Sequence, residues 1–222
     1  MRKVIGIPAY INENRNCFGV GISYLEFASK YGVPRLIMPE EEFVDVDLLL
    51  LTGGADMNPD SFGAVPGFRT SHTDVFKQFF YDRRLDSYID NNIPIIGICL
   101  GMQQLAAKFG SRITQDLKYH ASYIDSKGLH KMRPVNGTGA IKLFEGKLPE
   151  VNSRHHQGVL ISDLGDSLVP LFTSDDEYMD NLVEVFRHAS KPIYGLQYHP
   201  EDILDDISDK IMNQLLSENG SI

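Results

Sequence analysis

The chain has 222 residues, 42% of them hydrophobic and 23% charged, a globular composition long enough to bury one sizeable core. Its net charge of -9, from 30 acidic and 21 basic residues without a long basic run, argues against a nucleic-acid-binding surface. The two cysteines, Cys17 and Cys99, and the scattered histidines have no spacing typical of a disulfide framework or a metal site, and no apolar stretch reaches the ~18 residues that a membrane span needs. We therefore expect one domain over residues 1–222, located in the cytoplasm, with no metal, no cofactor and no membrane or nucleic-acid partner.

Strand and helix signals alternate in the first half of the chain. A short β-branched run at residues 3–9 is followed by a helix-compatible segment at 21–31, which ends at Gly32. Apolar runs at 34–38 and 46–51 predict two more buried strands. This order favours an α/β fold with a mostly parallel central sheet.

A glycine turn follows the third of these strands, in the segment from Thr52 to Asp56. Ligands bind at the carboxyl edge of open parallel sheets, and Gly53 and Gly54 would let a substrate approach the backbone closely. The turn would then supply oxyanion-binding N–H groups, although Gly-Gly is also a common feature of plain loops. Residues 58–72 are predicted to form a mobile loop or lid, and residues 75–91 a helix.

Cys99 lies in the segment Gly-Ile-Cys-Leu-Gly-Met-Gln, between an apolar run at 93–96 and a helix-prone run at 102–108. A strand-to-helix turn with Gly97 and Gly101 on either side of the cysteine is a nucleophile elbow that carries a thiol. The first N–H groups of the helix, beginning with that of Leu100, would favour a thiolate and stabilise an oxyanion. A buried, inert cysteine is the alternative, and the flanking glycines argue against it.

Secondary structure is predicted less completely in the second half of the chain, because residues 110–130 show no clear helix or strand pattern. Strands are predicted at 139–144, 154–161, 182–186 and 193–198, and an amphipathic helix at 203–216. In a strand, His155 and His156 would face opposite sides, so at most one of them would reach a shared pocket.

His199 is the natural base for the cysteine, because it too stands at the carboxyl end of a predicted strand. Pro200 restricts its backbone to an extended shape, and Glu201 is placed to orient the imidazole and stabilise its protonated form. A His-Pro-Glu segment alone is usually a turn before a helix. Combined with the cysteine elbow, it predicts a Cys99, His199, Glu201 triad.

These motifs resemble the class I glutamine amidotransferase-like superfamily, whose triad is Cys, His, Glu in that order. Further stretches are most similar to its peptidase C26 branch of γ-glutamyl-γ-aminobutyrate hydrolase-like proteins: LTGGADMNPDSFG, ITQDL, VNSRHHQGV, LVEVFR and YGLQYHPE. The resemblance implies a three-layer, flavodoxin-like fold, an oxyanion hole made by the amides of Gly54 and Leu100, and a substrate site. The expected substrate-site residues are Gly53, Gln103, Ser153 and His156.

Three positions depart from the hydrolase branch. Leu100 follows the nucleophile where that branch usually has arginine, and the wording around Cys99 is more usual in glutamine amidotransferases. Lys77 and Gln78 align with an arginine-aspartate pair of the branch. The difference at Leu100 concerns the chemistry of the acceptor that receives the glutamyl group or the ammonia. The differences at Lys77 and Gln78 concern the substrate pocket.

Three functions follow from this reading. The first is hydrolysis of a γ-glutamyl amide such as γ-glutamyl-GABA through a cysteine thioester. The second is a glutaminase subunit that passes ammonia to a synthase carried on another chain, with glutamine as substrate. The third is a redox-sensing or ligand-binding cysteine, which would leave His199 and Glu201 without a role. A symmetric homodimer is compatible with each of them.

Overall fold

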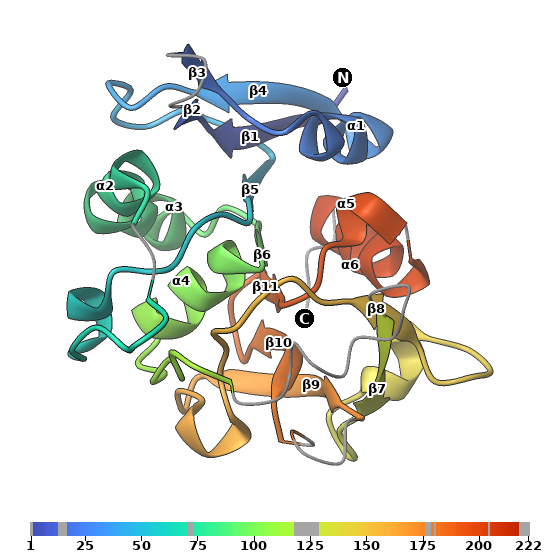
Figure 1. The fold of residues 1–222 in the computed structure, drawn as a ribbon. Helices are drawn as coiled ribbons and strands as arrows, with labels where there is room; N and C mark the ends of the chain where they lie inside the picture. Colours follow the sequence, from blue (N-terminus) through green and yellow to red (C-terminus); the bar gives the residue numbers. More distant parts are fainter. Residues whose placement is uncertain are drawn as a thin grey trace.

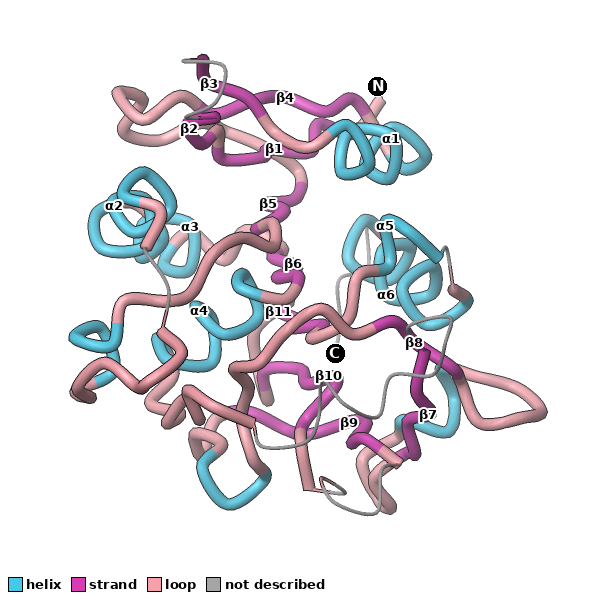
Figure 2. Tube along the Cα trace, viewed as in Figure 1, coloured by secondary structure: helices cyan, strands magenta, loops and turns pink. Residues whose placement is uncertain are grey.

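A nine-stranded sheet runs through the molecule in the order β4-β1-β5-β6-β11-β10-β9-β7-β8. The computed structural model describes residues 2–12, 17–70, 73–117, 129–175, 179, 181–203 and 205–217. Helices α2, α3 and α4 cover one face of the sheet, and α1, α5 and α6 cover the other (Figure 1). Coloured by secondary structure, the strands form a column between two groups of helices (Figure 2). The predicted three-layer α/β fold is confirmed.

The elements have the following bounds. The strands of the sheet are β1 (Val4–Pro8), β4 (Val33–Ile37), β5 (Leu48–Leu51), β6 (Ile95–Ile98), β7 (Leu129–Pro134), β8 (Glu150–Asn152), β9 (Leu168–Ser174), β10 (Val183–His188) and β11 (Ile193–Leu196). A separate hairpin pairs β2 (Tyr10–Asn12) with β3 (Cys17–Gly19). The α-helices are α1 (Ile22–Tyr31), α2 (Val75–Arg83), α3 (Leu85–Asp90), α4 (Leu100–Lys108), α5 (Pro200–Ile203) and α6 (Asp206–Leu216). Three 3-10 turns are η1 (Pro59–Phe62), η3 (Ala140–Leu143) and η4 (Ile161–Asp163).

The sheet changes from parallel to antiparallel pairing beyond β11. Strands β4, β1, β5, β6 and β11 pair in parallel. Strands β10, β9, β7 and β8 continue the sheet in antiparallel fashion. Strands β5, β6 and β11 are buried throughout, which explains why the sequence shows them as continuous apolar runs. Within the described residues, no helix is long and apolar enough to cross a bilayer.

Several predicted elements differ from those observed. The helix predicted at 75–91 is interrupted at Arg84, which separates α2 from α3, and the closing helix predicted at 203–216 is observed as α6, which begins at Asp206 after the short helix α5. The strand predicted at 139–144 is wrong, because Gly139, with a φ of 84°, begins the 3-10 turn η3 there. The strand predicted at 154–161 is also wrong, since β8 ends at Asn152 and only isolated bridges involving Gly158 and Leu160 follow.

The loop predicted at 58–72 contains the 3-10 turn η1 and is tied to the segment after α4. The Gln115 side chain accepts from the backbone N–H of Gly67 and donates to the backbone oxygen of Val65. Residues 71 and 72 lie outside the described residues, as do 118–128 of the unassigned region at 110–130. Movement of this loop stays a prediction.

Candidate active site

Three neighbouring parallel strands end at the same edge of the sheet, and each is followed by residues of the predicted site. Leu51 of β5 is paired with Gly97 of β6, and Ile98 of β6 with Leu196 of β11. Residues Thr52–Gly54, Cys99 and Gln197–His199 therefore come together, although they lie far apart in the sequence. The predicted grouping at one sheet edge is observed.

Cys99 forms the turn between β6 and α4. Its backbone has a φ of 51° and a ψ of -105°, a conformation that an L-residue adopts only under strain. The turn is held because the Cys99 N–H donates to the oxygen of Leu196 (2.7 Å) and the Cys99 oxygen accepts from the N–H of Gln103 (3.1 Å). The side chain is buried, with only 6% of the residue exposed, which counts against the redox-sensor alternative.

The two glycines of the elbow are required by close packing rather than by positive φ. A Cβ atom on Gly97 would lie 2.5 Å from the backbone of Gly101, and one on Gly101 would lie 2.4 Å from the oxygen of Leu51. The backbone of α4 thus packs directly on β5 and β6. The left-handed position of the turn falls on Cys99 itself.

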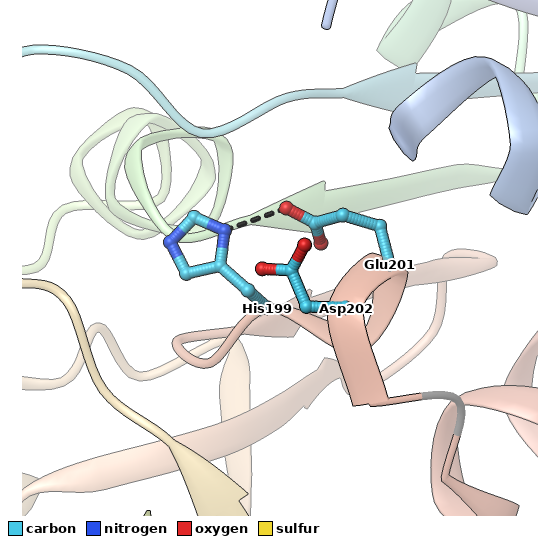
Figure 3. A group of neighbouring side chains, drawn as sticks. All are labelled: His199, Glu201 and Asp202. Atoms are coloured by element: carbon cyan, nitrogen blue, oxygen red, sulfur yellow. Dashed lines mark hydrogen bonds and ion pairs between the residues drawn. The ribbon is translucent and has the colours of Figure 1, made fainter. Parts of the chain in front are cut away.

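His199 and Glu201 form a buried pair directly after β11. Nδ1 of His199 lies 2.6 Å from Oε1 of Glu201 (Figure 3). Burial alone lowers the pKa of His199, but its interactions with Cys99 and Glu201 outweigh this and raise the pKa to about 10. The protonated form of the imidazole is therefore favoured at neutral pH.

The backbone of His199 is held by Asn152, the last residue of β8. Its Oδ1 accepts from the His199 N–H (2.7 Å), and its Nδ2 donates to the His199 oxygen (3.0 Å). One side chain thus satisfies both polar groups of a buried residue between a strand and a short helix. Asn152 was not among the predicted site residues, and its only signal in the sequence is its place in the VNSRHHQGV stretch.

Gly53 lies against both predicted reactive residues. A Cβ atom there would lie 2.8 Å from Cε1 of His199 and 3.4 Å from Cβ of Cys99. The Gly53 N–H donates to the hydroxyl oxygen of Tyr24 in α1 (3.0 Å), and this hydroxyl is also 3.4 Å from Nδ1 of His199. Burial, reinforced by Glu201, raises the pKa of Tyr24, so its hydroxyl remains a neutral hydrogen-bonding group. Tyr24, like Asn152, was not among the predicted site residues.

The two predicted oxyanion donors lie next to each other. Leu100 is the first residue of α4, so its N–H has no partner within the helix. Gly54 is exposed, and a Cβ on it would come within 3.0 Å of Cδ2 of Leu100. Two backbone N–H groups beside a cysteine at a helix N-terminus can stabilise a developing negative charge. Their role as an oxyanion hole stays a prediction.

The other predicted substrate residues differ in their surroundings. Gln103 is buried, and its Nε2 donates to the oxygen of Gln157 (2.9 Å) and to Oε1 of Gln197 (3.3 Å). Nε2 of His156 lies 3.0 Å from Oδ1 of Asp56, in the loop that continues from Gly54. Ser153 and His155 are buried, and Nδ1 of His155 is 2.9 Å from the oxygen of Gln157. Substrate contacts by Gln103, Ser153 and His156 stay predictions.

Within the described residues, one group of three neighbouring side chains could in principle bind a metal ion: His199, Glu201 and Asp202 (Figure 3). Glu201 bonds to His199, whereas the Asp202 carboxylate forms an ion pair with Arg154. The group thus divides into a candidate base with its orienting acid and a neighbouring ion pair.

The sequence profile of the peptidase C26 family matches residues 3–201. A Lactococcus lactis protein described as glutamine amidotransferase-like, YvdE, is 36% identical over 194 residues, which are 81% of this chain and 79% of that protein. Anthranilate synthase component 2 of Saccharolobus solfataricus is 26% identical over 130 residues, covering 59% of this chain and 62% of its own.

Solved structures confirm the fold. A glutamine amidotransferase from Thermotoga maritima superposes with a TM-score of 0.60 at 20% identity, covering 97% of this chain and 89% of its own. A GMP synthase-like protein from Thermoplasma acidophilum superposes with a TM-score of 0.67, also at 20% identity, covering 99% and 97%.

Proposed function

This chain belongs to the peptidase C26 family of glutamine amidotransferase-like proteins, and we propose that it hydrolyses a γ-glutamyl amide through a thioester on Cys99. The observation that carries the proposal is the buried His199–Glu201 pair, which is set against Cys99 where three parallel strands end. Such a charge arrangement activates a thiol and then returns a proton to a leaving group.

The reaction has two steps. The Cys99 sulfur attacks the γ-carbonyl carbon, and the N–H groups of Gly54 and Leu100 stabilise the negative charge that develops on its oxygen. His199 gives a proton to the leaving amine as the C–N bond breaks, which leaves a γ-glutamyl thioester. Water, activated by the now neutral His199, then attacks the thioester, releases glutamate and restores the Cys99–His199 pair.

The test is turnover and intact mass of the full chain with glutamine, γ-glutamyl-GABA, γ-glutamyl-putrescine and a γ-glutamyl anilide. We expect hydrolysis of at least one bulky amide and a glutamyl adduct that is absent from Cys99→Ala. A variant Cys99→Ala with undiminished turnover would contradict the mechanism, because loss of the nucleophile removes nearly all covalent catalysis.

A second candidate is a glutaminase subunit that delivers ammonia to a synthase on another chain. Leu100 favours it, and so does the likeness to a protein named as a component of anthranilate synthase. This candidate predicts that the isolated chain releases ammonia slowly from glutamine and does not cleave γ-glutamyl amines. Fast cleavage of the amines with no action on glutamine would exclude it.

A further inference from the structure

Lys77 is a buried lysine in the first turn of α2, and the reaction steps above leave it without a task. Only 8% of the residue is exposed. Its Nζ donates to Oγ1 of Thr52 (2.9 Å) and to the backbone oxygen of Gly53, and it lies 4.2 Å from the ring centroid of Tyr10. The two hydrogen bonds direct the ammonium group at the loop that follows β5.

Burial of the Lys77 ammonium group disfavours its charged form, but hydrogen bonds to the loop after β5 compensate for part of this cost. Burial lowers the pKa of Lys77 to about 8, although the negative groups Asp74, Cys99 and Glu201 oppose that effect. A buried lysine is costly unless its charge has well-placed partners. Here one partner is a backbone carbonyl at the candidate site.

The Gly53 oxygen and the Gly54 N–H belong to the same peptide unit. No cis peptide bond occurs among the described residues, so this unit is planar and trans, with its C=O and N–H pointing in opposite directions. A donor fixed on the Gly53 oxygen therefore sets the direction of the Gly54 N–H. Glycine on both sides makes the unit free to rotate without such a restraint.

Gly53 is held at both of its backbone polar groups. Tyr24 accepts from its N–H, and Lys77 donates to its oxygen. The two contacts come from α1 and α2, on opposite faces of the sheet (Figure 1). Because the peptide is trans, the Gly54 N–H points opposite to the carbonyl that Lys77 binds; the Cβ position of Gly54 lies 2.8 Å from the Lys77 Nζ and 3.0 Å from the Leu100 side chain.

We propose that Lys77 is a positioning residue that holds the Gly53–Gly54 peptide with its N–H turned into the oxyanion site. This inference rests on the proposed function, because it assigns Lys77 to the step in which the γ-carbonyl oxygen becomes negative. A nearby cation also polarises the peptide and makes its N–H a stronger donor.

The test compares Lys77→Met and Lys77→Arg with Lys108→Met in the full chain. Lys108 is a matched control, because it also lies over a tyrosine ring, that of Tyr81 at 4.6 Å, and pairs with Asp86, but it touches neither Thr52 nor Gly53. The assays are kcat and KM with glutamine and a γ-glutamyl anilide, and the rate at which iodoacetamide alkylates Cys99. Alkylation requires the thiolate but develops no oxyanion, so it separates the two roles.

For Lys77→Met we expect kcat to fall about 10- to 100-fold, below the ~10²–10³-fold loss of a complete oxyanion donor. KM and the alkylation rate should stay within about threefold of the wild type, Lys77→Arg should recover most of kcat, and Lys108→Met should change neither rate. An unchanged kcat in Lys77→Met, or an alkylation rate that falls in parallel with kcat, would overturn the inference.

A second readout does not depend on turnover. In protein labelled with 15N-glycine, the amide resonance of Gly54 should move in Lys77→Met and stay in place in Lys108→Met. An unmoved Gly54 resonance in Lys77→Met overturns the inference even if the wild type cleaves none of the tested substrates. Absence of wild-type turnover would by itself reject only the proposed function.

Discussion

Replacement of Asn152 by alanine should damage the site without touching any reacting atom. The change removes both hydrogen bonds to the backbone of His199, at 2.7 and 3.0 Å, in a place where Asn152 itself is 7% exposed. An orphaned buried N–H or C=O costs about 1–3 kcal/mol. Only the His199 N–H is orphaned, because the His199 oxygen still accepts from the N–H of Asp202 (3.2 Å). One orphaned group and one lost hydrogen bond together predict a loss of about 2–4 kcal/mol in the free energy of unfolding.

The activity should fall further than this loss of stability implies. His199 is attached to the sheet at the end of β11, and Asn152 is the side chain that fixes its backbone from β8. A shift of ~1 Å in a catalytic group can reduce the rate ~10²-fold. We expect kcat of Asn152→Ala to fall about 10- to 100-fold at a temperature where the variant is fully folded.

The measurements are urea unfolding and steady-state kinetics with a γ-glutamyl anilide. Asn213→Ala is the matched control, because the Asn213 side chain also donates to two acceptors, the backbone oxygen and the carboxylate of Asp209, but on the exposed surface of α6. It should lose less than about 1 kcal/mol and retain full activity. If Asn152→Ala unfolds more easily but keeps the wild-type kcat, the reasoning that links the His199 backbone to catalysis is refuted.

Three further predictions concern the same edge of the sheet. The pKa of His199, raised from its ordinary 6.5 to about 10, makes its contribution to stability full below pH 6.5 and lost as the pH rises to 10. Cys99 and, after it, Glu201 raise this pKa, so Glu201→Gln should flatten part of the urea-derived stability profile between those limits; parallel profiles would refute this. Gly53→Ala should lower both Tm and kcat, because its Cβ would lie 2.7 Å from the Tyr24 hydroxyl and 2.8 Å from His199. Gly19→Ala is the control and should be neutral, because no atom lies within 4 Å of its Cβ position. Equal effects of the two substitutions would contradict the packing argument. Cys99→Gly should be more stable to urea than Cys99→Ala by about 1 kcal/mol, the reverse of the usual order, since only glycine relieves the positive φ at that position.

The parts of this molecule that the sequence predicted are those with strong local signals. Strands β1, β5, β6 and β11 are short apolar runs bounded by turns, and helices α1 and α4 lie where the sequence places them. Most strands of the antiparallel part of the sheet were not predicted. β7 and β9 contain Pro134 and Pro170, their faces are partly exposed, and their partners lie far away in the sequence.

The same distinction applies to the candidate site. Cys99, His199 and Glu201 could be selected as candidate catalytic residues because each lies in a short sequence motif, the cysteine elbow or the His-Pro-Glu segment, that is typical of such residues. Asn152 and Tyr24 could not, and Lys77 stood out only as a departure from the hydrolase branch, because their roles depend on contacts with backbone groups at least 24 positions away along the chain. A hydrogen bond to a distant peptide leaves no periodic trace in a sequence.

The charges at this edge explain why so many supporting residues are needed. His199 and Lys77 are buried cations, and the groups that stabilise their charges include the same two anions, Cys99 and Glu201. Each buried cation would be costly alone, so removal of a shared anion changes the balance for both cations. Glu201→Gln should therefore lower the pKa of both His199 and Lys77, while Asn152→Ala should move His199 without altering the total charge. The supporting contacts of Asn152, Tyr24 and Lys77 all include backbone groups, which carry no net charge. Bonds to these backbone groups can fix the geometry of the site without adding a further charge to it.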